Sequence, residues 1–511
     1  MTDGPADPAA RPEPQEASVA DQVDDYRRLR EELERAVLPL ATSLDGRRFT
    51  FQASLHHLGL RVGGYVVLEG EGHASFGQVL TMGPEAISTP DLHVGASSTG
   101  VRVRAASGEG VVLDRTDKPF HDAHVRPATP DEVDAWFARV RPARSVLPIG
   151  DLLLSDGVAV NLDAGGFNRH TFLCGQSGSG KTYSLGLLLE RLLVQTRLRI
   201  IILDPNSDYV QLGHVRDGTD PEVAAGYAAA AADVSVWGND DAADSPLRFR
   251  FADVDAAARA ALLGIDPIID REEHAALSAL LAAGHDDRPL ITGLDALVSS
   301  DDPDVRRLGL RAANLGVLDW SIWSRGQGRS LVQELQEPTT RCLVVDLGSL
   351  DSIDEQRLVS ETVLSTLWRH RSRREPCLVV IDEAHNVCPS RPMDPITALA
   401  TDYAARIAAE GRKFGLYLLT STQRPQKVNE EVLSQCDNLL LMRMNSEGDL
   451  GHLRDTFSFV PAGLIEKATT FGLGEALVAG KFFPHPTYVK FGSRTSREGG
   501  ADIPTSWATT G

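Results

Sequence analysis

The first feature of the chain is a block of short segments, between about residues 48 and 128, in which hydrophobic and polar positions alternate. A period of two along short apolar runs is the pattern of half-buried β-strands. Glycine-rich steps separate the runs and supply turns. The predicted strands are residues 49–54, 65–68, 77–80 and 101–104. Several short strands joined by glycine turns are typical of a small β-barrel, which we assign to residues 45–146.

The residues before this block follow two other patterns. Residues 1–24 hold six acidic side chains, one arginine and several prolines among few apolar residues. Such a stretch buries too little apolar surface to fold, so we predict a disordered acidic tail. Apolar side chains then recur at helical spacing, at Tyr26, Leu29, Leu33, Val37 and Leu40. This period predicts an amphipathic N-terminal helix, which we assign to residues 25–44.

From residue 147 onward, continuous apolar runs alternate with longer segments of helical period. Runs of this kind are typical of parallel strands that are covered on both faces. They occur at residues 199–204, 342–347, 377–381, 416–420 and 439–443. The predicted fold class is therefore α/β, with a core at residues 147–493. Residues 253–336, rich in alanine, leucine and charged residues, predict a helical insertion, and residues 494–511, which lack periodicity, predict a C-terminal tail.

Composition places the chain among globular proteins with more than one domain, because it has 511 residues, of which 42% are hydrophobic and 24% charged. Its five cysteines are spaced singly, which argues against a disulfide framework and a zinc ribbon. The sequence has no apolar run of about 18 residues, and its N-terminus lacks the pattern of a signal peptide. We therefore expect a cytoplasmic protein with no membrane partner.

The formal net charge of −20 argues against a simple nucleic-acid-binding protein, because phosphate binding depends on clustered lysine and arginine. The total charge does not reveal how charges are distributed over the surface, however, and an acidic ring can enclose a basic channel. One candidate contact is the basic run at residues 369–374, which can equally cap the helix before it. A second comprises Trp320, Trp323, Arg325 and Arg329, for which a buried tryptophan pair is the simpler explanation.

The clearest chemical motif lies at residues 175–182, between a short apolar strand and a helix. It fits the spacing G-x-x-x-x-G-K-[ST] of a phosphate-binding P-loop, and its context distinguishes it from a chance glycine-rich turn. Glycines let successive backbone N–H groups point at one anion, at the positive end of the helix. The predicted ATP-binding residues are Gly175, Gln176, Ser177, Gly178, Ser179, Gly180, Lys181 and Thr182. We expect Lys181 to reach the β- and γ-phosphates and Thr182 to bind Mg²⁺.

Two adjacent carboxylates complete the predicted site. Asp382 and Glu383 directly follow the apolar run 377–381, as the second motif of a P-loop ATPase does. We predict that Asp382 holds Mg²⁺ and that Glu383 orients or deprotonates the attacking water. Gln423 follows the strand at 416–420, where it either senses the γ-phosphate or is an ordinary loop residue.

The order of these motifs resembles the HerA branch of the HerA/FtsK motor ATPases. The resemblance is carried by residues 168–170, 175–182, 204–209, 380–386, 410–415 and 422–425, and the segment 48–128 is similar to the N-terminal barrel of that family. It implies a RecA-like ATPase core, a homohexameric ring and ATP-driven translocation of double-stranded DNA. It also implies that a nuclease or other effector docks on the ring.

The resemblance implies a role for each residue of this chain that matches a motif position of the family. Within one subunit the acting residues are Lys181, Thr182, Asp382, Glu383 and Gln423, whereas Arg169 and Arg412 are candidates to reach the nucleotide of a neighbouring subunit. One departure from the family pattern is that Pro-Asn-Ser-Asp-Tyr follows Asp204, where a His-Gly-Glu-Tyr type of sequence is expected. The role of Asp208 is therefore open, and Asp204 either faces the ligand or is a turn residue.

Two hypotheses of different classes follow. In the first, the protein is an ATP-hydrolysing hexameric motor that translocates double-stranded DNA and acts with a partner nuclease or other effector in DNA repair or antiviral defence. In the alternative, ATP binding builds a ring scaffold that assembles and regulates a partner effector, and the acidic net charge favours this reading. A motor related to FtsK is less well supported, because no membrane segment precedes the P-loop.

Overall fold

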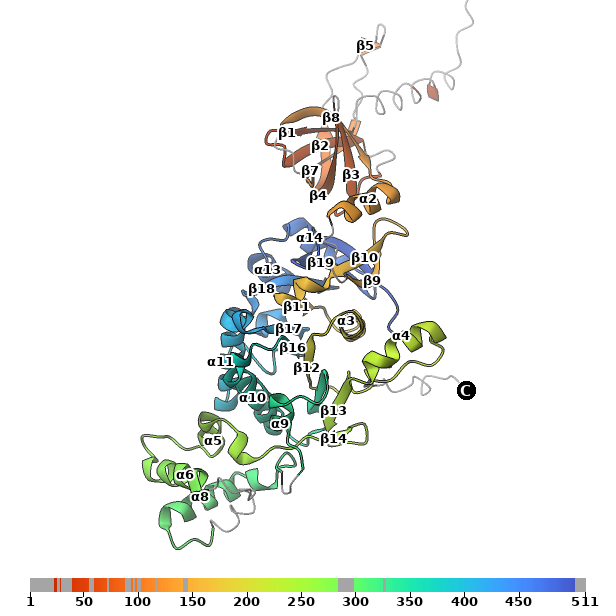
Figure 1. Cartoon of the computed structure of the whole chain (residues 1–511). Helices are drawn as coiled ribbons and strands as arrows, with labels where there is room; N and C mark the ends of the chain where they lie inside the picture. Colours follow the sequence, from red (N-terminus) through yellow and green to blue (C-terminus); the bar gives the residue numbers. More distant parts are fainter. Residues whose placement is uncertain are drawn as a thin grey trace, which may run out of the picture. The chain divides into compact units, whose positions relative to one another are not determined.

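The computed structural model describes residues 39–54, 59–70, 73–87, 103–114, 118–140, 146–283, 298–324 and 328–500, and the short pieces 23–24, 28, 93–94 and 97–98. The chain divides into two compact units, Met1–Ala128 and Thr129–Gly511 (Figure 1). The predicted acidic tail and most of the predicted N-terminal helix lie outside the described residues. Within the part that is described, no helix is both long and apolar enough to cross a membrane.

The first unit contains a closed antiparallel barrel, as the alternating pattern predicts. Its strands are β1 (Leu40–Ser43), β2 (Arg48–Ser54), β3 (Tyr65–Gly70), β4 (His73–Ile87), β7 (Val103–Val112) and β8 (Phe120–Pro127), in the order β1-β2-β7-β4-β3-β8; β5 (His93–Val94) and β6 (Ser97–Ser98) form a separate pair. Phe49 and Phe51 of β2 are almost fully buried in the core. A Cβ atom on Gly108 or Gly110 of β7 would collide with these rings, so glycine on one strand makes room for phenylalanine on the next.

Two boundaries of the barrel differ from the prediction. Residues Leu40–Ser43 are a strand and not the end of a helix, because β1 pairs with both β2 and β8 and closes the barrel. Pairing between distant segments overrides a local helical period of one turn. The first unit also ends at Ala128 and not at residue 146. Helix α2 (Pro130–Val140) belongs to the second unit, where the rings of Phe137 and Phe483 are 5.3 Å apart.

The second unit is built on one twelve-stranded sheet. Its strands are β9 (Val146–Leu152), β10 (Ala159–Asp163), β11 (His170–Cys174), β12 (Arg199–Asp204), β13 (Val234–Gly238), β14 (Ser245–Pro246), β15 (Cys342–Asp346), β16 (Cys377–Ile381), β17 (Leu416–Thr422), β18 (Cys436–Met442), β19 (Glu475–Gly480) and β20 (Thr487–Phe491). Their order is β10-β9-β20-β19-β18-β11-β17-β16-β12-β15-β13-β14. The strands from β18 to β14 are parallel to one another, and every residue of β11, β15 and β16 is buried, as continuous apolar runs predict.

The strand order places the predicted motifs at one edge of the sheet. The P-loop strand β11 lies between β17 and β18, and the acid-bearing strand β16 is the second neighbour of β11. Parallel strands present their carboxyl ends at the same edge, where open α/β sheets bind ligands. The loops after β11, β17, β16 and β12 therefore converge there, and the predicted RecA-like arrangement is confirmed.

Helices pack around this sheet, except that α6 and α8 of the insertion lie together beyond it (Figure 1). They are α3 (Lys181–Gln195), α4 (Pro221–Ala231), α5 (Ala256–Leu262), α6 (Arg271–Ala283), α8 (Pro303–Asn314), α9 (Leu331–Gln336), α10 (Ile353–Arg369), α11 (Pro395–Glu410), α12 (Glu430–Leu433), α13 (Glu447–Thr456) and α14 (Ala462–Glu466). Helices α5, α6 and α8 lie in the predicted insertion. There the half-buried Arg311 of α8 pairs with both Asp270 and Glu273, at 2.7 and 2.5 Å, and so links α6 to α8.

The tryptophan cluster forms a core. Trp323 is 3% exposed, and its ring centroid lies 5.6 Å from that of Phe249 and 5.5 Å from that of Phe251. Trp320 stacks on Trp323 at 6.3 Å. Arg325, the third member of the predicted nucleic-acid contact, lies outside the described residues. The simpler explanation, a buried tryptophan pair, is therefore correct for Trp323.

The C-terminal segment differs from the predicted tail at residues 494–511. Arg494, Thr495 and Ser496 are buried, and Ser496 forms an isolated β-bridge with Val215. Residues 501–511 lie outside the described residues. Polar contacts, and not an apolar face, hold this segment in place. Its sequence therefore contains no apolar repeat.

Candidate nucleotide-binding site

The loop after β11 has the backbone shape of a phosphate-binding loop. Gly178 and Gly180 have φ angles of +70° and +92°, in the left-handed region that favours glycine. The N–H of Gly474 donates to the carbonyl of Ser179 at 2.9 Å and anchors the loop from outside. Helix α3 begins at Lys181, so its free N–H groups and the positive end of its dipole lie at the loop.

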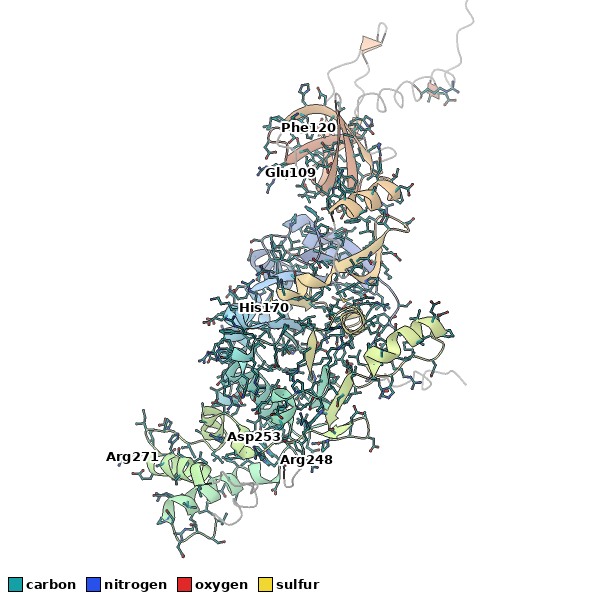
Figure 2. All side chains as sticks on the ribbon, in the orientation of Figure 1. Glu109, Phe120, His170, Arg248, Asp253 and Arg271 are labelled. Carbon is teal, nitrogen blue, oxygen red and sulfur yellow. The ribbon has the colours of Figure 1, made fainter. Side chains whose placement is uncertain are left out.

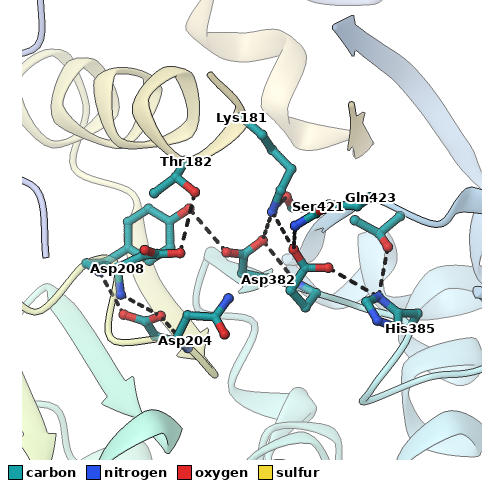
Figure 3. Close-up of polar contacts among 12 residues, drawn as sticks. Lys181, Thr182, Asp204, Asp208, Asp382, His385, Ser421 and Gln423 are labelled. Carbon is teal, nitrogen blue, oxygen red and sulfur yellow. Dashed lines mark hydrogen bonds and ion pairs between the residues drawn. The ribbon is translucent and has the colours of Figure 1, made fainter. Parts of the chain in front are cut away.

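Lys181 is the centre of a buried charge network (Figure 3). Its side chain is 6% exposed, and its Nζ atom lies 2.6 Å from Oδ1 of Asp382 and 3.0 Å from Oε1 of Glu383. Nζ also donates to Oγ of Ser421 at 3.2 Å. Burial by itself lowers the pKa of Lys181, but the two carboxylates outweigh burial and raise the pKa above its ordinary value. The ammonium group is therefore charged at neutral pH.

The two carboxylates follow β16 in a strained turn. Asp382 is fully buried, and its Oδ1 also accepts the N–H of Glu383 at 2.9 Å. Glu383 has a φ angle of +44°, which is unfavourable for any residue with a side chain. Nε2 of Gln423 donates to Oε1 of Glu383 at 3.0 Å, so the predicted Gln423 does join the predicted acids. Backbone strain of this kind is concentrated at functional sites.

Glu383 is ionised in this arrangement. Burial alone would raise its pKa, but a hydrogen bond with His385 and the charge of Lys181 bring the pKa down to about 2. Nδ1 of His385 lies 3.2 Å from Oε2 of Glu383 and 3.0 Å from Oγ1 of Thr422. Gln423 thus holds one oxygen of this carboxylate, and His385 lies beside the other.

The loop after β12 brings further acidic groups to the site. Asp204 is fully buried and accepts the N–H groups of Asp208 and Tyr209 at 3.0 and 2.7 Å, so it is a turn residue that folds its own loop. Oγ1 of Thr182 donates to Oδ2 of Asp208 at 3.4 Å, and the hydroxyl of Tyr209 donates to Oδ2 of Asp382 at 3.4 Å. Burial raises the pKa of Asp204 to about 8, and burial with the nearby charge of Asp382 raises that of Asp208 to about 6.

Several site residues were not assigned a definite role from the sequence, although His385 and Tyr209 lie in the stretches 380–386 and 204–209 that carry the resemblance. They are Ser421, His385 and Tyr209, which complete the network, and Arg443, whose Nη2 donates to the carbonyl of Gly178 at 3.0 Å. Each lies at the carboxyl end of a parallel strand or in the loop that follows it. Scoring every polar residue at such strand ends as a candidate would have found them.

Two predicted residues lie away from the site of their own subunit. Arg169 precedes β11 and Arg412 precedes β17, so both are at the edge of the sheet opposite the P-loop. They meet at Asp437, whose Oδ2 lies 2.7 Å from Nη1 of Arg412 and 3.8 Å from Nε of Arg169. Next to Arg169, His170 (Figure 2) is fully buried, and burial together with the charge of Arg412 lowers its pKa to about 4.

The donor atoms at the P-loop fit Mg²⁺. The hydroxyl of Thr182 and the carboxylates of Asp382 and Asp208 are hard oxygen donors, which Mg²⁺ prefers. Proteins usually hold this ion through one or two carboxylates together with substrate phosphates. The residues that the structure describes contain no cluster of three or more His, Cys, Asp and Glu side chains arranged as a metal site.

Comparison with known proteins supports the resemblance seen in the motifs. Residues 147–299 match the family model described as helicase HerA, central domain. The chain is 31% identical over 167 residues to the DNA double-strand break repair helicase HerA of Sulfurisphaera tokodaii, a match that covers 31% of this chain and 33% of that protein. A longer match, 22% identical over 434 residues, covers 70% of this chain and 73% of HerA from Pyrococcus furiosus.

A probable helicase of Methanocaldococcus jannaschii is 28% identical over 172 residues, and the chain spans about a third of the length of that protein and of the Sulfurisphaera protein. Among solved structures, VirB4 of Thermoanaerobacter pseudethanolicus is 18% identical, with a TM-score of 0.46, and the match covers 69% of this chain and 98% of that one. The predicted resemblance to HerA-type ATPases is confirmed by the family model and the HerA relatives.

Proposed function

We propose that this HerA-like chain hydrolyses ATP and uses the reaction to move double-stranded DNA through a homohexameric ring. The observation that supports the proposal most strongly is the convergence of the P-loop Lys181 with Asp382, Glu383 and Gln423 in one buried network. These residues come from the loops after three neighbouring strands, β11, β16 and β17. A phosphate-binding loop beside a carboxylate that can activate water is the arrangement that phosphoryl transfer to water requires.

The chain's residues divide the chemistry of hydrolysis among them. Lys181 exchanges its two carboxylate partners for the terminal phosphates of ATP and balances their charge. Glu383 then loses one of the contacts that lower its pKa, the charge of Lys181, and becomes a better acceptor for the proton of the attacking water. Gln423 and His385 hold Glu383 in place. Thr182 and Asp382 would hold Mg²⁺, which when bound would supply positive charge beside the phosphates.

Arg169 and Arg412 act in trans in this proposal. Both lie at the sheet edge opposite the P-loop of their own subunit, and head-to-tail packing in a ring brings the opposite edges of neighbouring subunits together. An arginine supplied by a neighbour stabilises charge on the transferred phosphate. Hydrolysis then depends on assembly.

A basic surface supports contact with DNA. Four arginines, with His370, line a cavity of about 30 Å³ at the edge of the sheet opposite the P-loop: Arg199, Arg371, Arg373 and Arg374. Among the described residues none of the four forms an ion pair. The guanidinium of Arg371 lies 4.3 Å from the ring centroid of Trp368. Glu375 also lines this cavity, but in a chain of net charge −20 a cluster of four arginines that form no ion pair is suited to a polyanion.

The finer parts of the proposal are a partner nuclease or other effector on the ring, a role in DNA repair or antiviral defence, and a cytoplasmic location. They follow from the resemblance to HerA, whose relatives are named as DNA double-strand break repair helicases. The alternative is a nucleotide-gated ring scaffold that regulates an effector, which the net charge of −20 favours. A Glu383→Gln variant that assembles, holds ATP and keeps full biological effect would select the scaffold.

The deciding experiment is ATP turnover with and without linear double-stranded DNA, recorded beside particle mass by light scattering. The motor hypothesis predicts a particle of six subunits. DNA should stimulate the ATP turnover of this particle, and Lys181→Ala should abolish that turnover. Turnover that is independent of DNA in the same particle would contradict the motor and leave the scaffold. Absence of turnover at all protein concentrations would contradict the assignment of an ATPase.

A further inference from the structure

The segment after the last strand, residues 492–500, lies against two elements of the nucleotide site. It follows β20 and runs between helix α3, which begins at the P-loop, and the loop that follows β12. We call this segment the strap. Its first contacts with α3 are a hydrogen bond from Nη2 of Arg191 to the carbonyl of Ser493, at 3.2 Å, and one from the N–H of Arg494 to the hydroxyl of Tyr183, at 2.8 Å.

A buried carboxylate on α3 is the main anchor of the strap. Glu190 and Arg494 are both fully buried, and Nε of Arg494 lies 3.5 Å from Oε1 of Glu190. The same carboxylate accepts the N–H of Thr495 at 2.9 Å, and the N–H and hydroxyl of Ser496 at 2.6 Å each. The guanidinium lies so close to Gly186 that a Cβ there would overlap it. Several directional bonds to one buried carboxylate fix the position of the strap along α3.

The other end of the strap holds the loop after β12. The N–H of Arg497 donates to the carbonyl of His214 at 2.8 Å, and the N–H of Gly499 donates to the carbonyl of Asp208 at 3.1 Å. A Cβ on Gly499 would overlap the carbonyl oxygen of Ser207, so only glycine allows this close approach. The strap therefore contacts the backbone of the residue whose side chain points to the P-loop.

The two elements joined by the strap meet at the metal-binding residues. Oγ1 of Thr182, in the first turn of α3, lies 3.4 Å from Oδ2 of Asp208. We propose that the strap sets this spacing, and so positions Thr182 and Asp208 for the Mg²⁺ of a bound nucleotide, with Arg494 as a positioning residue that acts through Glu190. The inference rests on the proposed function, because it concerns the Mg²⁺ of the ATPase site.

A purely stabilising strap is the competing explanation, and nucleotide binding separates the two. The probe is a fluorescent ADP analogue, bound to the full chain first in EDTA and then with rising Mg²⁺. Residues that orient metal ligands typically cost about 10- to 100-fold in metal affinity when replaced. We expect the variants to bind the analogue normally in EDTA and to need about tenfold more Mg²⁺ for the half-maximal change.

Two variants act at the two ends of the strap. Arg494→Met leaves Glu190 buried without its cation, so the double variant Glu190→Gln with Arg494→Met removes the anchor without an unpaired charge. Gly499→Ala forces the strap away from Ser207 without any change of charge. The matched controls are Glu498→Gln, an exposed residue of the strap, and Gly492→Ala, whose added Cβ makes ordinary contacts.

The outcomes are distinct. A raised Mg²⁺ requirement in the double variant and in Gly499→Ala, with both controls like the wild type, supports the inference. An unchanged Mg²⁺ requirement, or equal weakening with and without Mg²⁺, overturns it and leaves the strap a stabilising element. A wild-type chain that binds the analogue without any dependence on Mg²⁺ also overturns the inference, whereas a chain that does not bind the analogue at all contradicts the proposed ATPase itself.

Discussion

The Nζ atom of Lys181 lies 2.6 Å from Oδ1 of Asp382, although the two residues are 201 positions apart in the sequence. This contact joins the phosphate-binding loop to the acid-bearing strand, and both partners are almost completely buried. A buried ion pair costs desolvation on both sides and is strongly destabilising to break from one side. The same contact therefore concerns both the stability of the chain and its chemistry.

Replacement of Lys181 is expected to affect both properties. Lys181→Ala leaves Asp382 and Glu383 buried without their cation, which costs about 3–5 kcal/mol of unfolding free energy, and it abolishes ATP turnover. Circular dichroism during thermal unfolding measures the first effect and phosphate release the second. The control is Lys467→Ala, an exposed lysine of the same unit. A Lys181→Ala protein as stable as the wild type would contradict the charge network.

Glu383→Gln is expected to separate binding from hydrolysis. The amide keeps the size of the side chain but cannot accept the proton of water, so turnover should fall by about 10² to 10⁴-fold. ATP should still bind, since Lys181 and Thr182 are intact. Single-turnover kinetics and equilibrium binding of ATP measure the two steps, and Glu375→Gln, an exposed residue, serves as the control. Equal loss of binding and turnover would indicate a structural role for Glu383.

Arg412 and Lys181 are expected to complement each other between subunits. Arg412→Ala keeps its own P-loop, and Lys181→Ala keeps its own arginine, so each is inactive alone when the arginine acts in trans. Rings assembled from a mixture contain interfaces at which an intact P-loop meets an intact Arg412, and these interfaces should regain turnover. Turnover against mixing ratio is the measurement. A mixture no more active than its components would place the action of Arg412 within its own subunit.

The arginine cluster predicts a salt-dependent affinity for DNA. Arg373 and Arg374 are exposed and form no ion pair among the described residues, so changing both to Gln should weaken binding to duplexes of any sequence. Each lost phosphate contact should reduce the slope of log affinity against log salt by about one. Fluorescence anisotropy over a range of salt measures the slope. The control is Arg454→Gln. Because Arg454 is paired with Glu447 and Glu466, this change should leave the slope unchanged.

Glu361 predicts a pH dependence of stability that is independent of the nucleotide site. It is fully buried on α10, and burial raises its pKa to about 8, against the effect of Arg369. Between the unfolded pKa, about 4.3, and the folded value, the folded chain binds one more proton than the unfolded chain. This contribution to stability is therefore present at low pH and is lost as the pH rises through about 8.

Glu361→Gln should remove this dependence. The amide needs no proton, so the variant should gain stability relative to the wild type as the pH rises from 5 to 8, by about 1.4 kcal/mol for each unit of pKa shift. Denaturant unfolding at several pH values measures the difference. The exposed Glu375→Gln again provides the control. A constant difference across the pH range would show that Glu361 is not protonated in the folded chain.

Continuous motifs made much of the site predictable. The P-loop, Asp382 with Glu383, and Gln423 each lie in or directly after a short apolar run, and the backbone geometry that they need is local. The partners of these residues were less predictable. His385 and Tyr209 lie in motif stretches, but the sequence did not show which groups they contact, and they join the site because parallel strands end at one edge. The sequence indicates each strand separately but does not indicate the order of the strands in the sheet.

The sequence by itself determined the fold class, the two units and the predicted P-loop chemistry, because period, turn residues and motif spacing are properties of neighbouring positions. Only the tertiary structure decided that Leu40–Ser43 is a barrel strand and that α2 belongs to the second unit. It also decided that residues 492–500 form a strap that Glu190 anchors. Each of these features depends on contacts between segments that are distant in the chain. The free energy of such contacts exceeds the local preference for helix or strand, and the contacts leave no periodic pattern in the sequence.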